Sequence, residues 1–148
     1  MKTCLVGCGG IAAVHGSVLT SDIDTEFVAA ADIKPEKAQT YAENFHTKPY
    51  PSLESMLEAE KPDVLHICTP HYLHVPMAIY SLERNINVFM EKPPAISFDQ
   101  LEELKKAAAK SEAQLGFCYQ NRYNASIRAA KDLIDSGHAY VAKNGDVY

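Results

Sequence analysis

The sequence predicts a doubly wound α/β fold, in which a parallel sheet of about six strands carries helices on both faces. Three observations predict it. Short apolar runs of strand length alternate with helical patterns, a glycine-rich loop follows the first run directly, and an aspartate ends the second run. Because strand and helix alternate, right-handed crossovers and a parallel, Rossmann-like sheet are favoured.

The composition is that of an ordinary globular domain. The chain has 148 residues, of which 47% are hydrophobic and 22% are charged. Its net charge of −5 comes without a basic stripe, which argues against nucleic acid as a partner. We expect no membrane partner and a cytoplasmic location, since no apolar run approaches the roughly 18 to 20 residues of a membrane span and no signal-peptide core follows Met1. The cysteines are scattered, which favours reduced thiols.

Five apolar runs are predicted to be buried strands. They cover residues 4–6, 27–31, 64–68, 86–90 and 115–119. Between them, apolar residues recur at helical spacing in three segments, 38–45, 73–80 and 101–108. Each of these stripes is suited to cover one face of the sheet.

Two boundary signals limit the later helices. Ser97 with Gln100 three residues on is a capping-box start, and Gly137 is a helix stop after the stripe of Ala130, Leu133 and Ile134. We therefore assign residues 1–137 to a dinucleotide-binding domain. Residues 138–148 form a tail with little periodicity, in which Asn144-Gly145 signals a turn.

The first strand runs directly into a glycine loop that reads G-x-G-x-x-A. In this loop Gly7 allows a tight turn, Gly9 lets the backbone approach a pyrophosphate, and Ala12 lets helix and strand pack closely. The helix that begins here would present free N–H groups to phosphates, so Gly10 and Ile11 join the predicted cofactor-binding residues. The alternative is a tight strand-to-helix turn without a ligand.

Asp32 ends the second predicted strand, 20 residues after Ala12. A carboxylate here can accept hydrogen bonds from both adenosine ribose hydroxyls and would repel a 2′-phosphate, so NAD is favoured as the cofactor. NADP stays open because Lys34 and Lys37 follow closely in the sequence. The alternative for Asp32 is an exposed capping carboxylate ahead of Pro35.

Two further segments follow predicted strands. Thr69-Pro70 comes after the fourth strand and Glu91-Lys92-Pro93 after the fifth. Ligands of open α/β sheets bind at the carboxyl ends of the strands, so both segments are candidate site residues. Without further information, Lys92 could equally be a solvated surface lysine.

Together, several of these motifs resemble the Gfo/Idh/MocA family of NAD(P)-dependent sugar and polyol oxidoreductases. The resemblance runs from about residue 2 to 137. It rests on the GCGGIA loop, Asp32, TPHYLH (69–74), EKPP (91–94) and QNRY (120–123), of which EKP is the most specific.

This resemblance implies that Lys92 is the catalytic residue, as a proton relay near the reacting carbon. An ammonium beside a substrate oxygen can polarise that oxygen and pass a proton as hydride moves, so the chemistry is reasonable on its own terms.

The resemblance also implies roles for other residues. Glu91 would be a ribose-binding carboxylate and Pro93 the residue that turns the chain. Thr69 and Pro70 would line the nicotinamide side, with His74 close to it. Asn121 and Arg122 are implied to meet cofactor or substrate. For His74 the alternative is a partly buried histidine at a helix start, and for Arg122 it is a surface arginine.

A rival use of some of these residues is a zinc site. Cys68, His71 and His74 form a C-x₂-H-x₂-H run of suitable ligand types. This spacing does not aim three side chains at one point, however, and no fourth ligand is obvious nearby. We therefore expect no metal site.

Family members carry a second α/β domain that binds the substrate, and the present chain stops where that domain would begin. We therefore expect the cofactor-binding half of an oxidoreductase that acts on sugar- or polyol-like small molecules. The alternative is a catalytically inactive, truncated module that binds the dinucleotide. Self-association stays open, since the family's association surface commonly belongs to the second domain.

Overall fold

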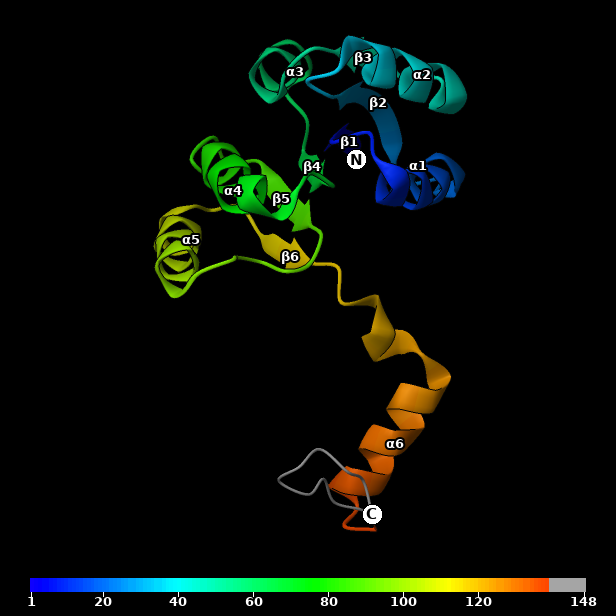
Figure 1. Ribbon diagram of the computed structural model, residues 1–148, viewed down its shortest axis with the longest axis vertical. Helices are drawn as coiled ribbons and strands as arrows, with labels where there is room; N and C mark the ends of the chain where they lie inside the picture. Colours follow the sequence, from blue (N-terminus) through cyan, green and yellow to red (C-terminus); the bar gives the residue numbers. More distant parts are fainter. Residues whose placement is uncertain (139–148) are drawn as a thin grey trace. The chain divides into compact units, whose positions relative to one another are not determined.

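The computed structural model describes residues 1–138, and its chain divides into two units (Figure 1). The first unit is Met1–Cys118 and the second is Tyr119–Tyr148. The domain boundary predicted at residue 137 stays a prediction, and the turn signal at residues 144–145 lies outside the described residues.

A six-stranded parallel sheet forms the centre of the first unit, in the strand order β3-β2-β1-β4-β5-β6. The predicted fold class is thereby confirmed, and the order is that of a Rossmann sheet. The strands are β1 (Lys2–Val6), β2 (Glu26–Ala31), β3 (Lys48–Tyr50), β4 (Val64–Ile67), β5 (Asn87–Met90) and β6 (Leu115–Phe117). In register, Val6 pairs with both Ala31 and Ile67, so three strands end together at one edge.

Helices cover both faces of this sheet. The first unit contains α1 (Gly10–Ser21), α2 (Pro35–Phe45), α3 (Leu53–Glu60), α4 (His74–Leu82) and α5 (Phe98–Lys110), with a short 3₁₀ turn at His71–Leu73. Alternate strand residues point to opposite faces: Leu5 and Ala30 pack with Tyr41 of α2, whereas Val6 packs in the larger core with residues of α3, α4 and α5. Within residues 1–138, no helix has the length and apolar character needed to cross a bilayer.

Two elements, the strand β3 and the helix α3 that follows it, are not covered by any predicted segment. β3 is only three residues long and includes Pro49, which is tolerated because β3 lies at the edge of the sheet. Such a strand has too few residues to show a period. Two predicted strands end earlier than expected, so Cys68 and Cys118 follow β4 and β6 instead of belonging to them.

Both predicted helix boundaries are confirmed. The Ser97 hydroxyl accepts a hydrogen bond from the Gln100 backbone N–H at 3.2 Å, although the Gln100 side chain accepts from Ile96 N–H and not from Ser97. In the second unit, which contains a 3₁₀ turn (Gln120–Tyr123) and α6 (Ala125–Asp135), Gly137 follows the helix with φ +77° and its N–H donates to Ile134 O.

Glu60, the last residue of α3, ties that helix to the sheet. Its side chain is almost fully buried and pairs with Lys2 of β1 at 3.1 Å and Lys48 of β3 at 2.9 Å, and it accepts a hydrogen bond from the Tyr50 hydroxyl at 2.6 Å. The hydrogen bonds from Tyr50 and Lys48 outweigh the opposing effect of burial and lower the pKa of Glu60 to about 2.

The substitution Glu60→Gln is expected to lower the free energy of unfolding at pH 7 by about 1 to 3 kcal/mol, because partly buried donors lose their charged acceptor. In the folded protein the pKa of Glu60 lies below its unfolded value of about 4.3, so the ionised form stabilises the fold above that pH. This stabilisation is lost as the pH falls from about 4.5 towards 2. Denaturant unfolding of both proteins at a series of pH values measures the effect.

Glu58→Gln is the matched control, because Glu58 lies on the same helix but is exposed. An equal loss of stability in both variants, or the same pH dependence for Glu60→Gln and the unmodified chain, would contradict the prediction.

Candidate nucleotide-binding site

The glycine loop after β1 passes directly over the chain segment that leaves β4. Gly7 adopts φ +92°, and a Cβ atom placed on it would lie 2.7 Å from backbone atoms of both Cys68 and Thr69. Since these neighbours are backbone atoms, they cannot move aside as a flexible side chain would. Gly7 is therefore required both by its conformation and by this close approach.

The other glycines of the loop face open space. A Cβ atom on Gly9 or on Gly10 would meet no atom within 4 Å. Gly9 is the N-cap of α1 and supplies no side-chain cap, so the first N–H groups of the helix are left for another acceptor. This arrangement is suited to the phosphates of a dinucleotide.

Behind the loop, α1 packs tightly on α2. Ala12 is fully buried and its carbonyl accepts a hydrogen bond from the Tyr41 hydroxyl at 2.7 Å, whereas Ile11 is 40% exposed. A Cβ on Gly16 would lie 2.5 Å from the Tyr41 hydroxyl oxygen. Ala12 lies in one buried cluster with Leu5 of β1 and Ala30 of β2, whereas Gly16, which sequence reasoning did not single out, allows the close approach to α2.

Asp32 connects two loops with its carboxylate. Oδ2 accepts a hydrogen bond from the Cys8 N–H and Oδ1 accepts one from the Lys34 N–H, both at 2.9 Å. Burial, reinforced by the charge of Asp32, raises the pKa of the Cys8 thiol to about 12. The carboxylate is half-buried at the strand end, beside the glycine loop, where the sequence places the ribose-binding residue.

A pocket of about 310 Å³ lies beside this loop. It is lined by several of the predicted residues together with both lysines that kept NADP open: Gly7, Gly9, Asp32, Lys34, Lys37, Thr69 and Pro70. The Thr69 hydroxyl oxygen is buried and has no hydrogen-bond partner within the described residues. This pocket fits a dinucleotide, because it combines the unpaired Thr69 hydroxyl, a glycine loop that faces open space and the Asp32 carboxylate.

His74 joins the two segments that follow β4 and β5. The side chain is fully buried, with Nδ1 2.8 Å from Pro93 O and Nε2 3.0 Å from Thr69 O. Both ring nitrogens thus face backbone carbonyls, and this geometry leaves neither nitrogen for the zinc arrangement with Cys68 and His71 that the sequence suggested as a rival.

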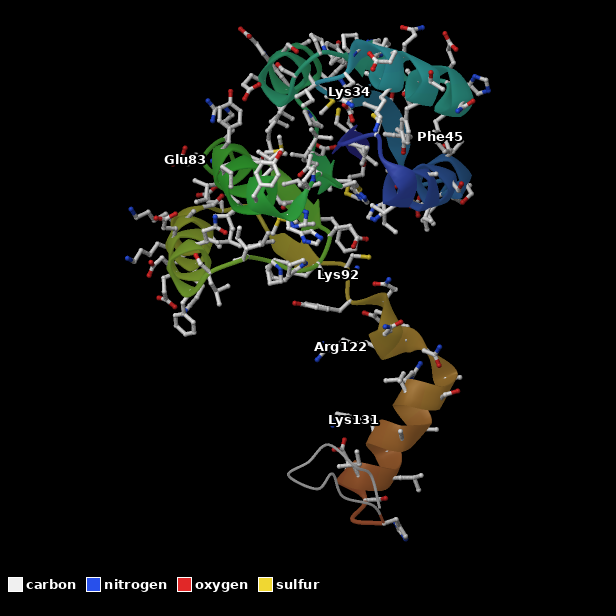
Figure 2. All side chains as sticks on the ribbon, viewed as in Figure 1. Lys34, Phe45, Glu83, Lys92, Arg122 and Lys131 are labelled. Atoms are coloured by element: carbon white, nitrogen blue, oxygen red, sulfur yellow. The ribbon has the colours of Figure 1, made fainter. Side chains whose placement is uncertain are left out.

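Lys92 follows β5 and its side chain is exposed (Figure 2). The Lys92–Pro93 peptide bond is cis. The preceding residue, Glu91, is 5% exposed, and its Oε2 accepts a hydrogen bond from the Lys92 N–H at 3.2 Å. The backbone around Lys92 is therefore fixed by two contacts, one from its N–H to the Glu91 carboxylate and one between Pro93 O and the His74 ring.

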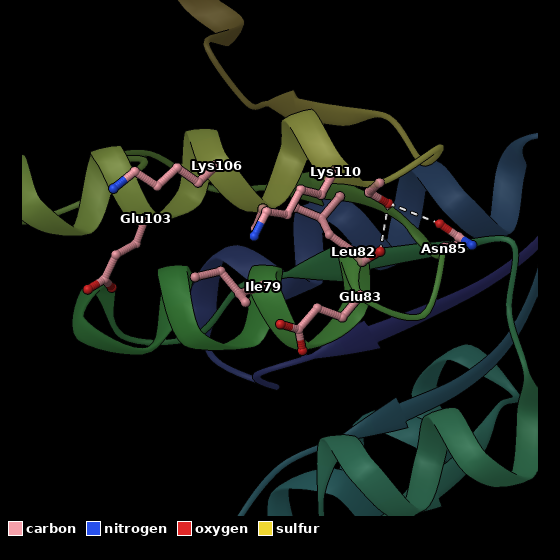
Figure 3. A pocket seen from close by; sticks show the side chains of 9 residues that line it. Ile79, Leu82, Glu83, Asn85, Glu103, Lys106 and Lys110 are labelled. Carbon is pink, nitrogen blue, oxygen red and sulfur yellow. Dashed lines mark hydrogen bonds between the residues drawn. The ribbon is translucent and has the colours of Figure 1, made fainter.

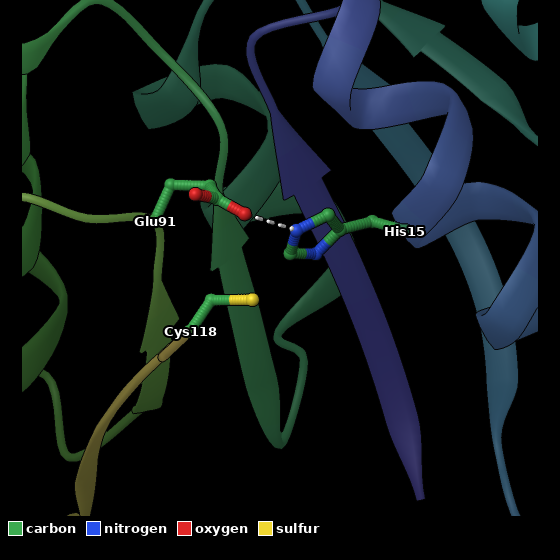
Figure 4. Close-up of side chains that lie close together, drawn as sticks. All are labelled: His15, Glu91 and Cys118. Carbon is green, nitrogen blue, oxygen red and sulfur yellow. Dashed lines mark hydrogen bonds and ion pairs between the residues drawn. The ribbon is translucent and has the colours of Figure 1, made fainter. Parts of the chain in front are cut away.

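Sequence reasoning missed two residues that contact Glu91, His15 and Cys118 (Figure 4), and a third, His66, that contacts His15. His15 Nε2 lies 3.0 Å from Glu91 Oε1, and His15 Nδ1 lies 2.9 Å from His66 Nδ1. Burial alone would raise the pKa of Glu91, but hydrogen bonds from His15, Cys118 and the Lys92 N–H outweigh it and lower that pKa. Burial, followed by the nearby His15, lowers the pKa of His66 to about 4.

Asn121 and Arg122 belong to the second unit. Both lie in its 3₁₀ turn and are exposed, and their backbone groups bond within that unit, Asn121 O to Asn124 N–H and Arg122 N–H to Tyr119 O. Their predicted role stays a prediction.

A larger hollow, of about 400 Å³, lies between α4 and α5 (Figure 3). Its lining mixes charges of both signs, Glu83 with Lys106 and Lys110, and it ends at Ser111, whose hydroxyl donates to Leu82 O at 2.6 Å. Since α4 ends just before β5 begins and α5 just before β6 begins, Ser111 lies at the amino ends of the strands. Ligands of open α/β sheets bind at the opposite edge.

Comparison with curated proteins shows several sugar and inositol dehydrogenases. The chain is 29% identical to a D-glucoside 3-dehydrogenase of Escherichia coli, over 93% of this chain and 40% of that protein. It is 28% identical to an inositol 2-dehydrogenase/D-chiro-inositol 3-dehydrogenase of Lacticaseibacillus casei, over 93% of this chain and 41% of that protein. The chain thus spans about 40% of the length of these relatives.

The solved structures that resemble this chain include dehydrogenases as well. The WlbA dehydrogenase of Chromobacterium violaceum, crystallised with NADH and UDP-GlcNAcA, matches 95% of this chain and 42% of its own at 31% identity and a TM-score of 0.89. The myo-inositol dehydrogenase of Lactobacillus casei, crystallised with NAD(H) and myo-inositol, matches at 25% identity and a TM-score of 0.84, over 93% of this chain and 42% of its own.

Residues 1–119 match the Gfo/Idh/MocA family, described as an oxidoreductase family with an NAD-binding Rossmann fold. The match covers well over half of the chain and includes the glycine loop, Asp32, the Thr69-Pro70 segment and the Glu91-Lys92-Pro93 segment, as the resemblance implied. The chain therefore belongs to the Gfo/Idh/MocA family of NAD-binding oxidoreductases.

Proposed function

We propose that this chain is the cofactor-binding part of an NAD-dependent oxidoreductase that acts on a sugar- or polyol-like substrate. The observation that carries the proposal is the pocket in which Gly7, Asp32 and Thr69 meet at the carboxyl edge of the sheet. Lys92 follows β5 at the same edge. A cofactor site and a proton-transferring group therefore share the edge where α/β sheets bind their ligands.

Each part of the pocket supports one part of the dinucleotide. The loop from Gly7 to Ala12, with the uncapped N-terminus of α1, is suited to the pyrophosphate. The Asp32 carboxylate is suited to bind the adenosine ribose hydroxyls. Lys34 and Lys37 line the same pocket and are near enough to bind the 2′-phosphate of NADP instead. The Thr69 hydroxyl and Pro70 line the other wall. The complexes of the two relatives with NADH and NAD(H) support the same cofactor.

The proposed chemistry is transfer of hydride between a substrate carbon and nicotinamide, which bound NAD supplies as the hydride acceptor. Lys92 would hold or move the proton of the substrate oxygen at its Nζ atom. Its backbone is fixed by Glu91 and, through Pro93 O, by His74. A positioned general acid or base contributes typically 10²- to 10⁴-fold to the rate.

The relatives support the proposed substrate class. Both curated dehydrogenases named above take a glycoside or an inositol, which are rings that carry secondary hydroxyl groups. The chain spans about 40% of the length of these relatives, so their substrate class is carried over to this chain as a proposal. Asn121 and Arg122 are proposed to contribute from the second unit. The alternative, a dinucleotide-binding module without turnover, uses the same pocket and differs in having no activity.

Asp32→Ala is expected to weaken NADH binding about 10- to 100-fold, because a charged acceptor of two ribose hydrogen bonds is lost. NADPH binding should change less, so the preference for NADH narrows. Fluorescence titration of the chain with each cofactor measures both constants. Asp24→Ala, which changes an exposed aspartate outside the pocket, is the control. Equal affinity of the unmodified chain for the two cofactors would remove the basis of this prediction.

Lys92→Met is expected to leave the Kd for NADH within about threefold while kcat for a sugar or polyol substrate falls by about 10²- to 10⁴-fold, because the proton-transferring group is removed. The measurement is the steady-state rate of NADH formation, made on a preparation of the protein that shows dehydrogenase activity. Lys110→Met, a surface lysine by the α4–α5 hollow, is the control. Undiminished turnover by Lys92→Met would show that the proton relay is another group.

A further inference from the structure

Three side chains with ligand atoms of different kinds meet inside the first unit, apart from the residues that line the nucleotide pocket. His15 comes from α1, Glu91 follows β5 directly and Cys118 follows β6 directly (Figure 4). A ring nitrogen of His15, a carboxylate oxygen of Glu91 and the Sγ atom of Cys118 all lie within 4.8 Å of one another. Residues far apart in the sequence therefore converge on one point.

The spacing of these atoms is close to that around a tetrahedral ion. Zinc bonds of 2.0 to 2.3 Å to nitrogen, oxygen and sulfur imply ligand atoms about 3.3 to 3.6 Å apart. His15 Nε2 and Glu91 Oε1 are 3.0 Å apart, and 4.8 Å is the upper limit for each pair. Shifts of about 1 Å, within the reach of small side-chain rotations, would place all three atoms on one ion.

The His15 ring is already oriented for this role. Its Nε2 faces Glu91, while its Nδ1 lies 2.9 Å from His66 Nδ1 on β4. Metal-binding histidines usually use their second nitrogen in a hydrogen bond that fixes the ring, as His15 does here through its contact with His66. An ion at Nε2 would replace the proton between His15 and Glu91 and leave Nδ1–H to donate to His66.

The environment and the ligand types favour a particular class of ion. His15 and Glu91 are 7% and 5% exposed, so the carboxylate is not an ordinary solvated surface group. Imidazole and thiolate ligands suit Zn²⁺ and similar borderline cations, whereas Mg²⁺ and Ca²⁺ prefer oxygen ligands alone. The mixed set of nitrogen, oxygen and sulfur therefore selects for Zn²⁺ or Co²⁺.

We infer that His15, Glu91 and Cys118 form a binding site for Zn²⁺ or a similar borderline divalent cation, with a fourth position open to water. The ion would link α1 to the ends of β5 and β6. It would lie next to Lys92, whose N–H bonds to the same carboxylate. This inference does not depend on the proposed function, and its test requires no enzymatic activity.

The test is a titration of the reduced, chelator-treated 148-residue chain with Co²⁺ in the absence of oxygen. Co²⁺ takes the place of Zn²⁺ in such sites, and a cobalt–thiolate bond gives a charge-transfer absorption band in the near ultraviolet. The expected result is saturable binding of one Co²⁺ per chain with this band, which added Zn²⁺ then abolishes.

Matched variants locate the site. Cys118→Ser should lose the band, whereas Cys8→Ser, which changes the half-buried thiol of the glycine loop, should keep it. His66→Gln should weaken Co²⁺ binding about 10- to 100-fold through the loss of the orienting hydrogen bond. His46→Gln, at an exposed histidine, should leave the affinity unchanged.

Circular dichroism of each variant confirms that it is folded. The inference is overturned if the folded, unmodified chain shows no saturable Co²⁺ binding, or if Cys118→Ser binds with the same band and affinity. His15→Gln provides a second measurement in case Cys118→Ser does not fold. Unchanged Co²⁺ affinity in that variant would equally contradict the site.

Discussion

The contact on which the site depends is the approach of the glycine loop to the chain leaving β4. At 2.7 Å from two backbone atoms, the position of a Cβ on Gly7 is forbidden, so the two segments meet without a side chain between them. Both segments line the pocket, one through Gly9 and the other through Thr69. The parallel register, in which β1 and β4 end together at Val6 and Ile67, brings them to the same edge. The candidate cofactor pocket is thus a consequence of strand order and one glycine.

The same edge is stabilised by polar side chains, which bond to backbone groups and, in the case of Glu91, also to the side chain of His15. Asp32 accepts hydrogen bonds from two loops, and His74 lies between the carbonyls of Thr69 and Pro93. Glu91 accepts from the Lys92 N–H and pairs with His15. These contacts fix loops that have no regular secondary structure, so their hydrogen bonds take over the role that ladder bonds have inside the sheet.

Much of this could be predicted from the sequence, because the signals are local. The alternation of strand and helix, the spacing from the glycine loop to Asp32 and the capping residue Ser97 each lie within a short window, and the structure confirms the fold and the helix start that they predict. β3 gave no signal because three residues that include Pro49 are too short for a period.

What could not be predicted depends on contacts between distant residues. His15 reads in the sequence as one position of the helix that follows the glycine loop, and its proximity to His66, Glu91 and Cys118 requires the strand order. The ribose-binding role implied for Glu91 stays a prediction, and its carboxylate is occupied by His15 and the Lys92 N–H. The sequence pattern of Cys68, His71 and His74, by contrast, suggested a rival zinc site, but both ring nitrogens of His74 face backbone carbonyls.

The central claim is that the pocket beside Gly7 and Asp32 binds a nicotinamide dinucleotide. The most direct test is a calorimetric titration of the 148-residue chain with NADH and, separately, with NADPH at one fixed salt concentration. The account predicts saturable binding of one NADH per chain, with a lower Kd than for NADPH. Absence of binding of both cofactors to the folded chain would contradict it.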